Sequence, residues 1–337
     1  NSGTIFGATD GLYFGDAQHD ALVVNKGHIL SNSRAVNIDG AGVVLANHGR
    51  IAGTDDQRNG TVYADNTADE YTILNHKGGV IDAGYGNNGS AISLQTGDSK
   101  GDVVFADVVN HGLVRGRGDA EEGNGIGDGV RLFSGVEDAV FQGSVVNHGR
   151  ILASKESDAA VGIRVEDGVR LDGGIVNHGR IFGSETAIDA SDAAPDIAVK
   201  NAGVIIGDVV LTDGNDLFDG AHGRVNGVVS GGAGADALIG GRRGDTLAGG
   251  AGDDDLTGNG GADIFVFAKE DAPSKDIVND FEDGRDRIDV SDFGFKSVAE
   301  IGVEQLGDNL RLTFDADNSV LLKDTSADQI TSDDFIF

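Results

Sequence analysis

The sequence predicts an all-β protein: a parallel β-helix, or solenoid, that continues into a β-roll and ends in a small β-rich cap. Glycine makes up 55 of the 337 residues, and aspartate outnumbers glutamate 45 to 11. Aspartate and glycine favour turns, whereas glutamate favours helices, so this composition indicates many short strands. Hydrophobic residues make up 39% of the chain, which is enough to form a core despite a net charge of −31.

A phrase of the form Asn-x-Gly-x-Ile-x-small recurs through the first two thirds of the chain. Copies begin at Asn1, Asn25, Asn47, Asn110, Asn147, Asn177 and Asn201, with a longer copy at Asn75 and one without Asn at Ala221. Successive copies are 20 to 37 residues apart. A basic period of about 20–24 residues with insertions of variable length is typical of stacked coils that carry loops.

Residue parity predicts which side chains of each coil face the core. Apolar residues stand two positions before and four positions after the Asn in most copies, as do Leu45 and Ile51 around Asn47. Alternate residues of a strand point the same way, so these apolar residues and the Asn are expected to face inward. We therefore expect the inward Asn side chains to stack as an amide ladder that satisfies backbone groups at the corners of neighbouring coils.

Histidines occupy an outward position of the same repeat. Six of the eight share it: His48, His76, His111, His148, His178 and His222. Such a row either binds a transition metal or responds to pH, or it is simply solvated at an exposed corner. We favour the solvated row, and the sequence has no HExxH motif of the zincin type.

Four consecutive nonapeptides from Gly231 to Val266 follow the pattern GGxGxDxUx, in which U is apolar. Glycine allows the tight turn and exposes carbonyl oxygens, and aspartate adds a charged oxygen ligand, a combination that suits several Ca²⁺ ions rather than zinc. Because successive turns alternate sides, we expect Asp236 to pair with Asp254 and Asp245 with Asp263. The candidate calcium-binding residues are Asp216, Gly232, Gly234, Asp236, Gly241, Asp245, Gly250, Gly252, Asp254, Gly261 and Asp263.

Position eight of each nonapeptide is expected to close a thin core between two stacked sheets. The residues there are Leu238, Leu247, Leu256 and Phe265. Two residues depart from the pattern, since Arg243 replaces the fourth-position Gly and Asn259 replaces a second-position Gly. We expect weaker calcium sites at those turns.

Residues 208–337 resemble the RTX family of type I secreted bacterial proteins. The stretch after the repeats resembles the C-terminal module of serralysin-type metalloproteases, and the final DDFIF is similar to the uncleaved export signal of that family. The resemblance implies export to the medium or the bacterial surface. We accordingly divide the chain into a β-helix (1–207), a calcium β-roll (208–266) and a cap with secretion signal (267–337). The first part resembles the β-helical repeats of bacterial surface adhesins and polysaccharide-active enzymes.

Composition also excludes several partners. A chain this acidic, without a basic stripe, is expected to be repelled by nucleic acid, and no apolar run is long enough to span a membrane. The absence of cysteine excludes disulfides and thiolate sites. The chain contains no Met, so we interpret it as a processed product or a fragment of something longer.

Two function classes remain open. Regular repeats without a singular chemical cluster favour a calcium-dependent structural or adhesive protein, with calcium, a second copy or a cell-surface polysaccharide as partner. We further expect head-to-tail assembly into filaments through residues 1–30. The alternative is a polysaccharide lyase, epimerase or hydrolase, although no catalytic residue can be assigned. Its candidate side chains are Tyr63, Tyr71, Tyr85, Arg115, Arg117 and Arg131.

Overall fold

The structure, a computed structural model, describes residues 1–15, 21–39, 42–53, 60–65, 70–83, 89–96, 103–118, 127–134, 140–166, 168–271 and 273–337. The chain divides into two compact units. Unit 1 comprises Asn1–Ala194 and Gly203–Asp208, and unit 2 comprises Pro195–Ala202 and Val209–Phe337. In the described part of the chain, unit 1 consists of β-strands with their connections, and unit 2 also contains short 3₁₀ turns. None of the described helices has the length and apolar character needed to cross a membrane.

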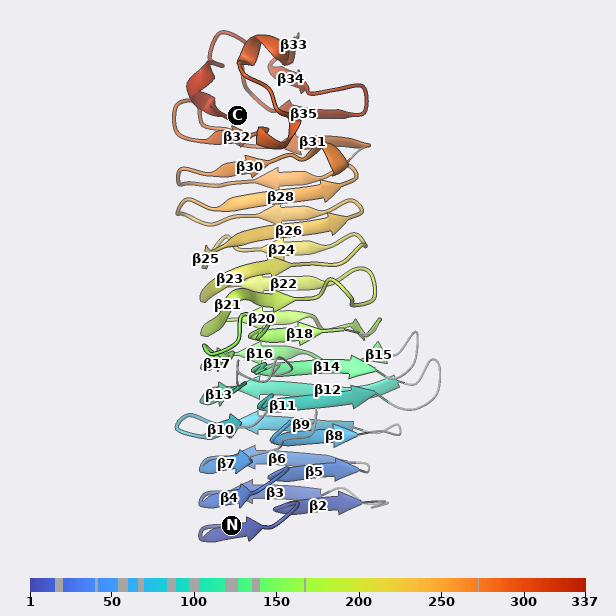
Figure 1. Cartoon of the computed structure of the whole chain (residues 1–337), viewed down its shortest axis with the longest axis vertical. Helices are drawn as coiled ribbons and strands as arrows, with labels where there is room; N and C mark the ends of the chain where they lie inside the picture. Colours follow the sequence, from blue (N-terminus) through green and yellow to red (C-terminus); the bar gives the residue numbers. More distant parts are fainter. Residues whose placement is uncertain are drawn as a thin grey trace. The chain divides into compact units, whose positions relative to one another are not determined.

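Unit 1 is built from three stacks of parallel strands, with one strand of each stack per coil (Figure 1). Stack 1 contains β1 (Thr4–Gly7), β4 (His28–Ser31), β7 (Arg50–Gly53), β10 (Val80–Ala83), β13 (Leu113–Arg115), β17 (Arg150–Leu152) and the start of β21 (Arg180–Asp189). Stack 2 contains β2 (Leu12–Gly15), β5 (Val36–Asp39), β8 (Val62–Asp65), β11 (Ile92–Thr96), β14 (Val130–Ser134), β18 (Ile163–Val165) and the end of β21.

The third stack of unit 1 carries the Asn of each repeat at its strand ends. It contains β3 (Ala21–Asn25), β6 (Val43–Asn47), β9 (Glu70–Asn75), β12 (Val103–Asn110), β16 (Val145–Asn147) and β20 (Ile175–Asn177). Two short strands, β15 (Val140–Phe141) and β19 (Arg170–Leu171), continue the pairing beside the start of β12. The predicted parallel β-solenoid is therefore confirmed.

The core of unit 1 lies between the three stacks and follows the predicted parity. The residues four positions after the Asn are fully buried in successive coils, among them Ile29, Ile51, Val114, Ile151 and Ile181. Aliphatic side chains stacked in register fill the interior with few voids, so each coil stabilises its neighbours chiefly by apolar burial.

The amide ladder runs along the same coils. Asn47 Nδ2 donates to Asn75 Oδ1 at 2.9 Å and to the Val80 carbonyl at 3.2 Å, while Asn47 Oδ1 accepts from the Gly49 N–H at 3.2 Å. One side chain thus joins three elements of two coils. The same arrangement links Asn25, Asn47, Asn75, Asn110, Asn147 and Asn177, all of which are buried.

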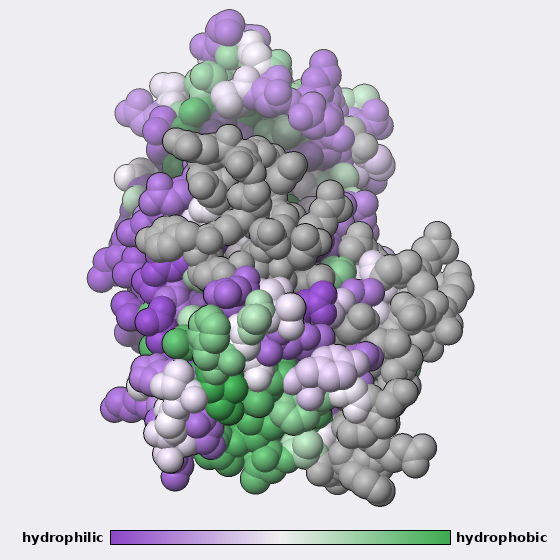
Figure 2. Space-filling view, turned by 60° about the horizontal axis from the view of Figure 1, so that its bottom comes forward, coloured by the Kyte–Doolittle hydropathy of each residue, from purple (hydrophilic) through white to green (hydrophobic). Residues whose placement is uncertain are grey.

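The first coil exposes apolar side chains. Phe6 and Leu22, in β1 and β3, are 64% and 70% exposed, and Ile5 is only half-buried although its counterpart Ile29 in the next coil is fully buried. Figure 2 shows that hydrophobic residues gather on this end face.

Unit 2 has two stacks of parallel strands that continue into an antiparallel hairpin. One stack contains β22 (Ala198–Asn201), β24 (Leu217–Asp219), β27 (Ala237–Ile239), β29 (Asp255–Thr257), β31 (Ser274–Val278) and β35 (Asn318–Leu322). The other contains the end of β23 (Val204–Val210), β26 (Val228–Ala233), β28 (Thr246–Ala251), β30 (Ile264–Val266), β32 (Arg287–Asp289) and β36 (Phe335–Ile336). The hairpin of β33 (Gly302–Leu306) and β34 (Asn309–Thr313) pairs with β35.

Four 3₁₀ turns and one short strand complete unit 2. These are β25 (Arg224–Asn226), η2 (Lys269–Asp271), η3 (Ser291–Phe293), η4 (Val298–Glu300) and η5 (Ser332–Asp334). The thin core between the two stacks is formed as predicted, because the position-eight side chains are fully buried. They are Leu238, Leu247, Leu256 and Phe265, together with Phe218 from the coil before them.

Candidate calcium site

Aspartates of successive coils in unit 2 form two columns, one on each side. Column A contains Asp216, Asp236, Asp254 and Asp276, and column B contains Asp245, Asp263 and Asp286; all seven side chains are buried. In column A the Asp236 N–H donates to Asp254 Oδ1 at 2.8 Å. In column B the Asp245 N–H donates to Asp263 Oδ1 at 2.8 Å. The two predicted pairs therefore lie side by side as expected.

In column A, two of the Oδ2 carboxylate oxygens lack a hydrogen-bond donor. Oδ2 of Asp236 and Oδ2 of Asp254 are buried and make no hydrogen bond. At the ends of the column the situation differs, because Asp216 Oδ2 accepts from the Thr212 N–H at 2.7 Å and Asp276 Oδ2 accepts from the Ser274 hydroxyl at 2.5 Å. A buried carboxylate oxygen without a donor is costly, and a bound cation would offset that cost.

The glycines beside these two oxygens have backbone conformations that other residues rarely adopt. Gly232 and Gly250 have φ values of 107° and 101°, and Gly234 and Gly252 have φ values of 117° and 124°. A Cβ atom on Gly250 would lie 2.0 Å from the Gly232 carbonyl oxygen, and one on Gly252 would lie 1.9 Å from that of Gly234. Only glycine fits these turns, and their carbonyl oxygens are stacked from coil to coil.

The free carboxylate oxygens lie against those glycine turns. A Cβ atom on Gly231 would lie 2.1 Å from Asp236 Oδ2, and one on Gly249 would lie 2.1 Å from Asp254 Oδ2. Carbonyl and carboxylate oxygens thus come together without a cationic side chain, which is the donor set that Ca²⁺ prefers. Among the described residues no three His, Asp or Glu side chains converge on one point, so the carboxylates stand beside backbone oxygens rather than beside one another.

Burial changes the proton affinity of the two columns. Burial, with like-charged neighbours in second place, raises the pKa of Asp236 and Asp263 to about 7 and that of Asp254 to about 6. The pKa of Asp276 is raised to about 7, chiefly by burial. Each of these aspartates therefore carries its negative charge at a free-energy cost, and a divalent cation would reduce that cost.

Column B differs from column A in what its turns already bind. Asp245 Oδ2 accepts the Gly241 N–H at 2.6 Å, and the amide of Asn259 donates to the Gly240 carbonyl at 2.9 Å. Asn259, with φ of 65°, also donates its own N–H to Asp280 at 2.7 Å. Asn259 thus binds the Gly240 carbonyl with its side chain, whereas Gly250, at the matching position of column A, has no side chain to do so.

The remaining glycine of the predicted set, Gly261, has φ of 154°, and a Cβ atom there would lie 2.4 Å from the Arg243 carbonyl carbon. Two column members were missed from the sequence, namely Asp276 and Asp286. Neither follows the glycine pattern, but each precedes a fully buried apolar residue by two positions, Val278 and Ile288 respectively. A search for the shorter Asp-x-apolar spacing would have found both residues, whereas a search for the full nonapeptide pattern does not.

The histidine row of unit 1 faces outward as predicted. The rings of His48 and His76 stack at 3.9 Å between centroids, and His148 stacks on His111 at 4.6 Å and on His178 at 4.8 Å. The rings of neighbouring coils are nearly parallel, with interplanar angles of 3° to 9°. His222, in unit 2, is exposed as well.

The candidate catalytic residues that the structure describes do not assemble into one centre. Arg115 and Arg117 both bind Asp82, at 2.7 Å and 2.9 Å, whereas Arg131 is paired with Glu166. The hydroxyl of Tyr63 donates to Gln95 at 2.7 Å. Tyr71 is buried, and Tyr85 lies outside the described residues.

Comparison with known proteins agrees with the geometry of unit 2. Residues 191–336 match the family model described as "Peptidase M10 serralysin C terminal". No curated protein sequence matches the chain. The C-terminal part of this chain is therefore similar to a serralysin C-terminal domain, a region associated with RTX repeats, and it follows a parallel β-solenoid with an asparagine ladder.

Proposed function

We propose that this chain is a calcium-dependent, secreted solenoid protein with a structural or adhesive role at the bacterial surface or in the extracellular matrix. The observation that carries the proposal is the pair of buried oxygens without donors, Asp236 Oδ2 and Asp254 Oδ2, beside turns that only glycine can form. They belong to a region, 208–337, in which 28 acidic and 10 basic residues give a net charge of −18.

Calcium would be held on column A by Asp236 and Asp254 together with glycine carbonyls of the turns at Gly232 and Gly250. The ion supplies positive charge that neutralises the column. Without it, self-repulsion and the cost of buried carboxylates oppose folding of this region. Extracellular modules bind Ca²⁺ with Kd of about 10⁻⁴–10⁻³ M, so a low-calcium cytosol would keep the region unfolded for export. On column B, Asp245 and Asp263 would form weaker sites because Asn259 occupies a neighbouring carbonyl.

Type I secretion is proposed from the serralysin-like match and from the final residues. In the division proposed here, 208–266 form the calcium β-roll and 267–337 form the cap that contains the export signal. Asp334 caps η5 by accepting the Thr331 N–H at 2.7 Å, and Phe335 in β36 is buried. The segment proposed as the signal is thus part of the folded structure, and we infer that the chain is exported unfolded and folds once it meets calcium.

A structural or adhesive role is supported by the regularity of unit 1, where side chains that could serve catalysis are engaged elsewhere. Arg131 binds Glu166, and Tyr63 donates to Gln95. A polysaccharide-active enzyme is the alternative, supported by the placement of Arg115 and Arg117 in one groove. Incubation with acidic polysaccharides and an assay for new reducing or unsaturated ends separates the two roles, since a lyase or hydrolase releases such ends and an adhesive protein does not.

The proposed function also includes head-to-tail assembly with a second copy of the chain. The exposed apolar side chains of Phe6 and Leu22 support it, because contact with a second copy would bury them. Sedimentation in calcium tests it: Phe6→Asp with Leu22→Asp should abolish concentration-dependent association. Association that persists unchanged in this variant would contradict it.

Circular dichroism of the full chain, with chelator and then with millimolar calcium, tests the calcium proposal. We expect a rise in β signal on adding calcium and no rise on adding magnesium. A β signal that is complete in chelator would overturn the proposal.

A further inference from the structure

A groove on unit 1 carries a concentration of positive charge that the composition of the chain does not suggest. Five cationic side chains and, among the described residues that line it, one carboxylate, Glu156, surround a cavity of about 410 Å³. The cations are Arg115, Arg117, Arg150, Lys155 and Arg180. Residues 1–207 have 15 basic and 28 acidic residues, so this groove is positive on a part of the chain whose net charge is −13.

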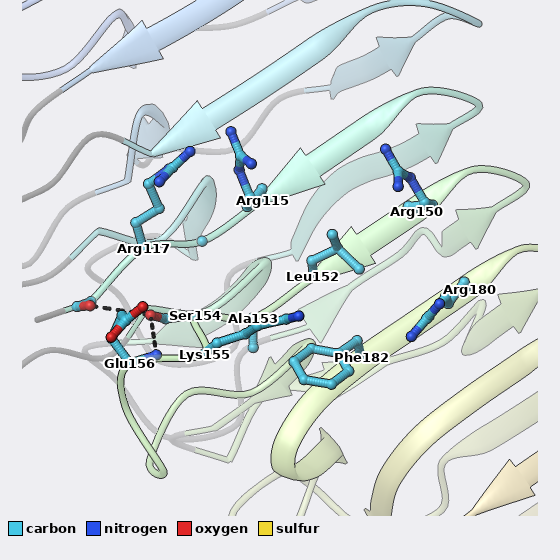
Figure 3. Close-up of a pocket in the computed structure, with 12 residues that line it drawn as sticks. Arg115, Arg117, Arg150, Leu152, Ala153, Ser154, Lys155, Glu156, Arg180 and Phe182 are labelled. Carbon is cyan, nitrogen blue, oxygen red and sulfur yellow. Dashed lines mark hydrogen bonds between the residues drawn. The ribbon is translucent and has the colours of Figure 1, made fainter. Parts of the chain in front are cut away.

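Two of these arginines form no ion pair with another described residue. Arg150 and Arg180 are exposed and in parallel register on β17 and β21, one coil apart, or about 4.8 Å. In the described part of the chain no carboxylate or hydrogen-bond acceptor binds either guanidinium. Figure 3 shows both side chains on the same side of the groove. They therefore present two planar guanidinium groups, one coil apart, whose N–H groups are available to a ligand.

A buried carboxylate holds two other arginines of the groove in place. Asp82, which is 3% exposed, accepts from Arg115 at 2.7 Å and from Arg117 at 2.9 Å, and Arg50 approaches it at 3.2 Å. Burial alone would raise the pKa of Asp82, but the hydrogen bonds and charges of Arg115 and Arg117 outweigh burial and lower it. Three arginines on one carboxylate leave an excess of positive charge in a fixed geometry.

The groove also has an apolar floor, which continues the column of Arg115. Leu152 and Phe182 are neighbours on β17 and β21, and Lys155 Nζ lies 5.5 Å from the centre of the Phe182 ring (Figure 3). A ligand that fits has negative charge at intervals and an apolar face between the charges. The groove is open rather than enclosed and runs across three coils, β13, β17 and β21, so it suits a segment of a linear polymer.

We propose that this groove binds a strand of acidic polysaccharide, whose carboxylate or sulfate groups pair with Arg150 and Arg180 while a sugar ring lies on Leu152 and Phe182. Arginine binds such anions through two parallel N–H donors. A nucleic acid fits less well, because the described lining of the groove has one aromatic side chain rather than a series on which bases stack. An acidic peptide lacks rings with a flat apolar face.

This proposal rests on the proposed adhesive role and names the class of ligand that would be bound. The calcium-dependent folding and the polysaccharide binding can nevertheless be tested separately. Calcium-induced folding is measured on unit 2, whereas the groove lies within unit 1. Loss of the calcium effect with intact binding would contradict only the proposed function, and absence of binding by a calcium-folded protein would contradict only the groove.

The test measures binding of the full chain, in millimolar calcium, by isothermal titration calorimetry. The probes are a galacturonate hexamer, a sulfated oligosaccharide, the methyl-esterified galacturonate hexamer and a short poly-glutamate. We expect one or both acidic sugars to bind and binding to weaken with added salt, with the neutral ester and poly-glutamate at least about tenfold weaker. Equal binding of the ester or of poly-glutamate would overturn the proposal.

A pair of variants tests the residues. Arg150→Gln with Arg180→Gln should weaken binding of the acidic sugar by about tenfold or more, and Lys155→Gln alone by less. The matched control, Arg170→Gln with Arg224→Gln, removes the same charge outside the groove and should leave the affinity within about twofold. Calcium can bridge carboxylates by itself, so equal losses in both double variants, or no loss in either, would overturn the assignment.

Discussion

Asp236 and Asp254 lie in successive coils on one side of unit 2, joined by a hydrogen bond of 2.8 Å from the Asp236 N–H to Asp254 Oδ1, and each keeps a buried Oδ2 without a donor. This arrangement gives the Asp236 N–H an acceptor and leaves one oxygen of each carboxylate without a hydrogen bond. Both of these oxygens lie against glycine turns, an arrangement that is consistent with a bound cation.

The first prediction removes that pair of charges. Asp236→Asn with Asp254→Asn keeps the shape and the oxygen that accepts the backbone N–H but weakens the attraction for Ca²⁺. The calcium concentration at the midpoint of folding, followed by circular dichroism, should rise by about tenfold or more. The control Glu300→Gln, an exposed acid, should leave the midpoint nearly unchanged. Equal midpoints for the two variants would contradict the assignment of column A.

The second prediction concerns protons in the absence of calcium. The pKa of Asp236 and Asp263 is raised from 3.8 to about 7 in the folded chain, so the folded state binds protons that the unfolded state releases. The stabilisation from these protons is present at low pH and is lost as the pH rises from about 4 through about 7. In chelator, acidification from about pH 8 to about pH 5 should therefore increase the β signal.

In calcium the same titration should run the other way, because protons and Ca²⁺ compete for the same oxygens. Asp236→Asn with Asp254→Asn should reduce the chelator response, because these positions no longer titrate. A chelator response that is the same size in this variant would show that other groups cause it.

The third prediction tests the amide ladder. Asn147 accepts from Asn110 Nδ2 at 2.8 Å and donates to Asn177 Oδ1 at 2.8 Å and to the Arg180 carbonyl at 3.1 Å. Asn147→Leu leaves buried polar groups without partners and should lower the free energy of unfolding by about 1–3 kcal/mol, measured by denaturant titration in calcium. Glu185→Leu, at an exposed position of the same unit, is the control and should change it by less than about 0.5 kcal/mol. Equal stabilities would contradict the ladder.

The fourth prediction concerns His148, whose ring lies between those of His111 and His178. Partial burial, followed by the charges of these two neighbours, holds the pKa of His148 below its ordinary value of 6.5. A histidine with a lowered pKa favours the neutral state in the folded protein, so its contribution to stability is lost as the pH falls through about 6.5. NMR titration should show this, and His111→Gln with His178→Gln should raise the pKa of His148. No rise would contradict the stacked row.

Much of this architecture could be predicted from the sequence because one repeat fixes the parity of every coil. The inward Asn ladder, the buried Ile four residues later and the pairing of Asp236 with Asp254 all follow from spacing. Asp276 and Asp286 were missed, because the complete glycine pattern that marks the turn is absent before them and the Asp-x-apolar spacing is what both retain. That spacing alone is too short to be specific, and the stacking of the coils is what shows that the columns continue.

The groove could not be predicted either. Arg150 and Arg180 share a repeat position, so their common column is visible in the sequence. That Asp82 binds Arg115 and Arg117 beside them depends on the register of coils separated by insertions of different length. Likewise, Leu152 and Phe182 become a floor only when β17 and β21 pair. Because the groove is formed by residues of three coils, the spacing of residues within one coil does not predict it.

The central claim is that calcium folds unit 2 and not unit 1, and hydrogen–deuterium exchange of the full chain tests it most directly. In calcium, amides of both units should be protected. In chelator, amides of Asn25–Asn177 in the core strands of unit 1 should stay protected, while those of Val228–Ile288 should exchange rapidly, because the carboxylates of column A are then uncompensated. Equal protection of Val228–Ile288 with and without calcium would contradict the account.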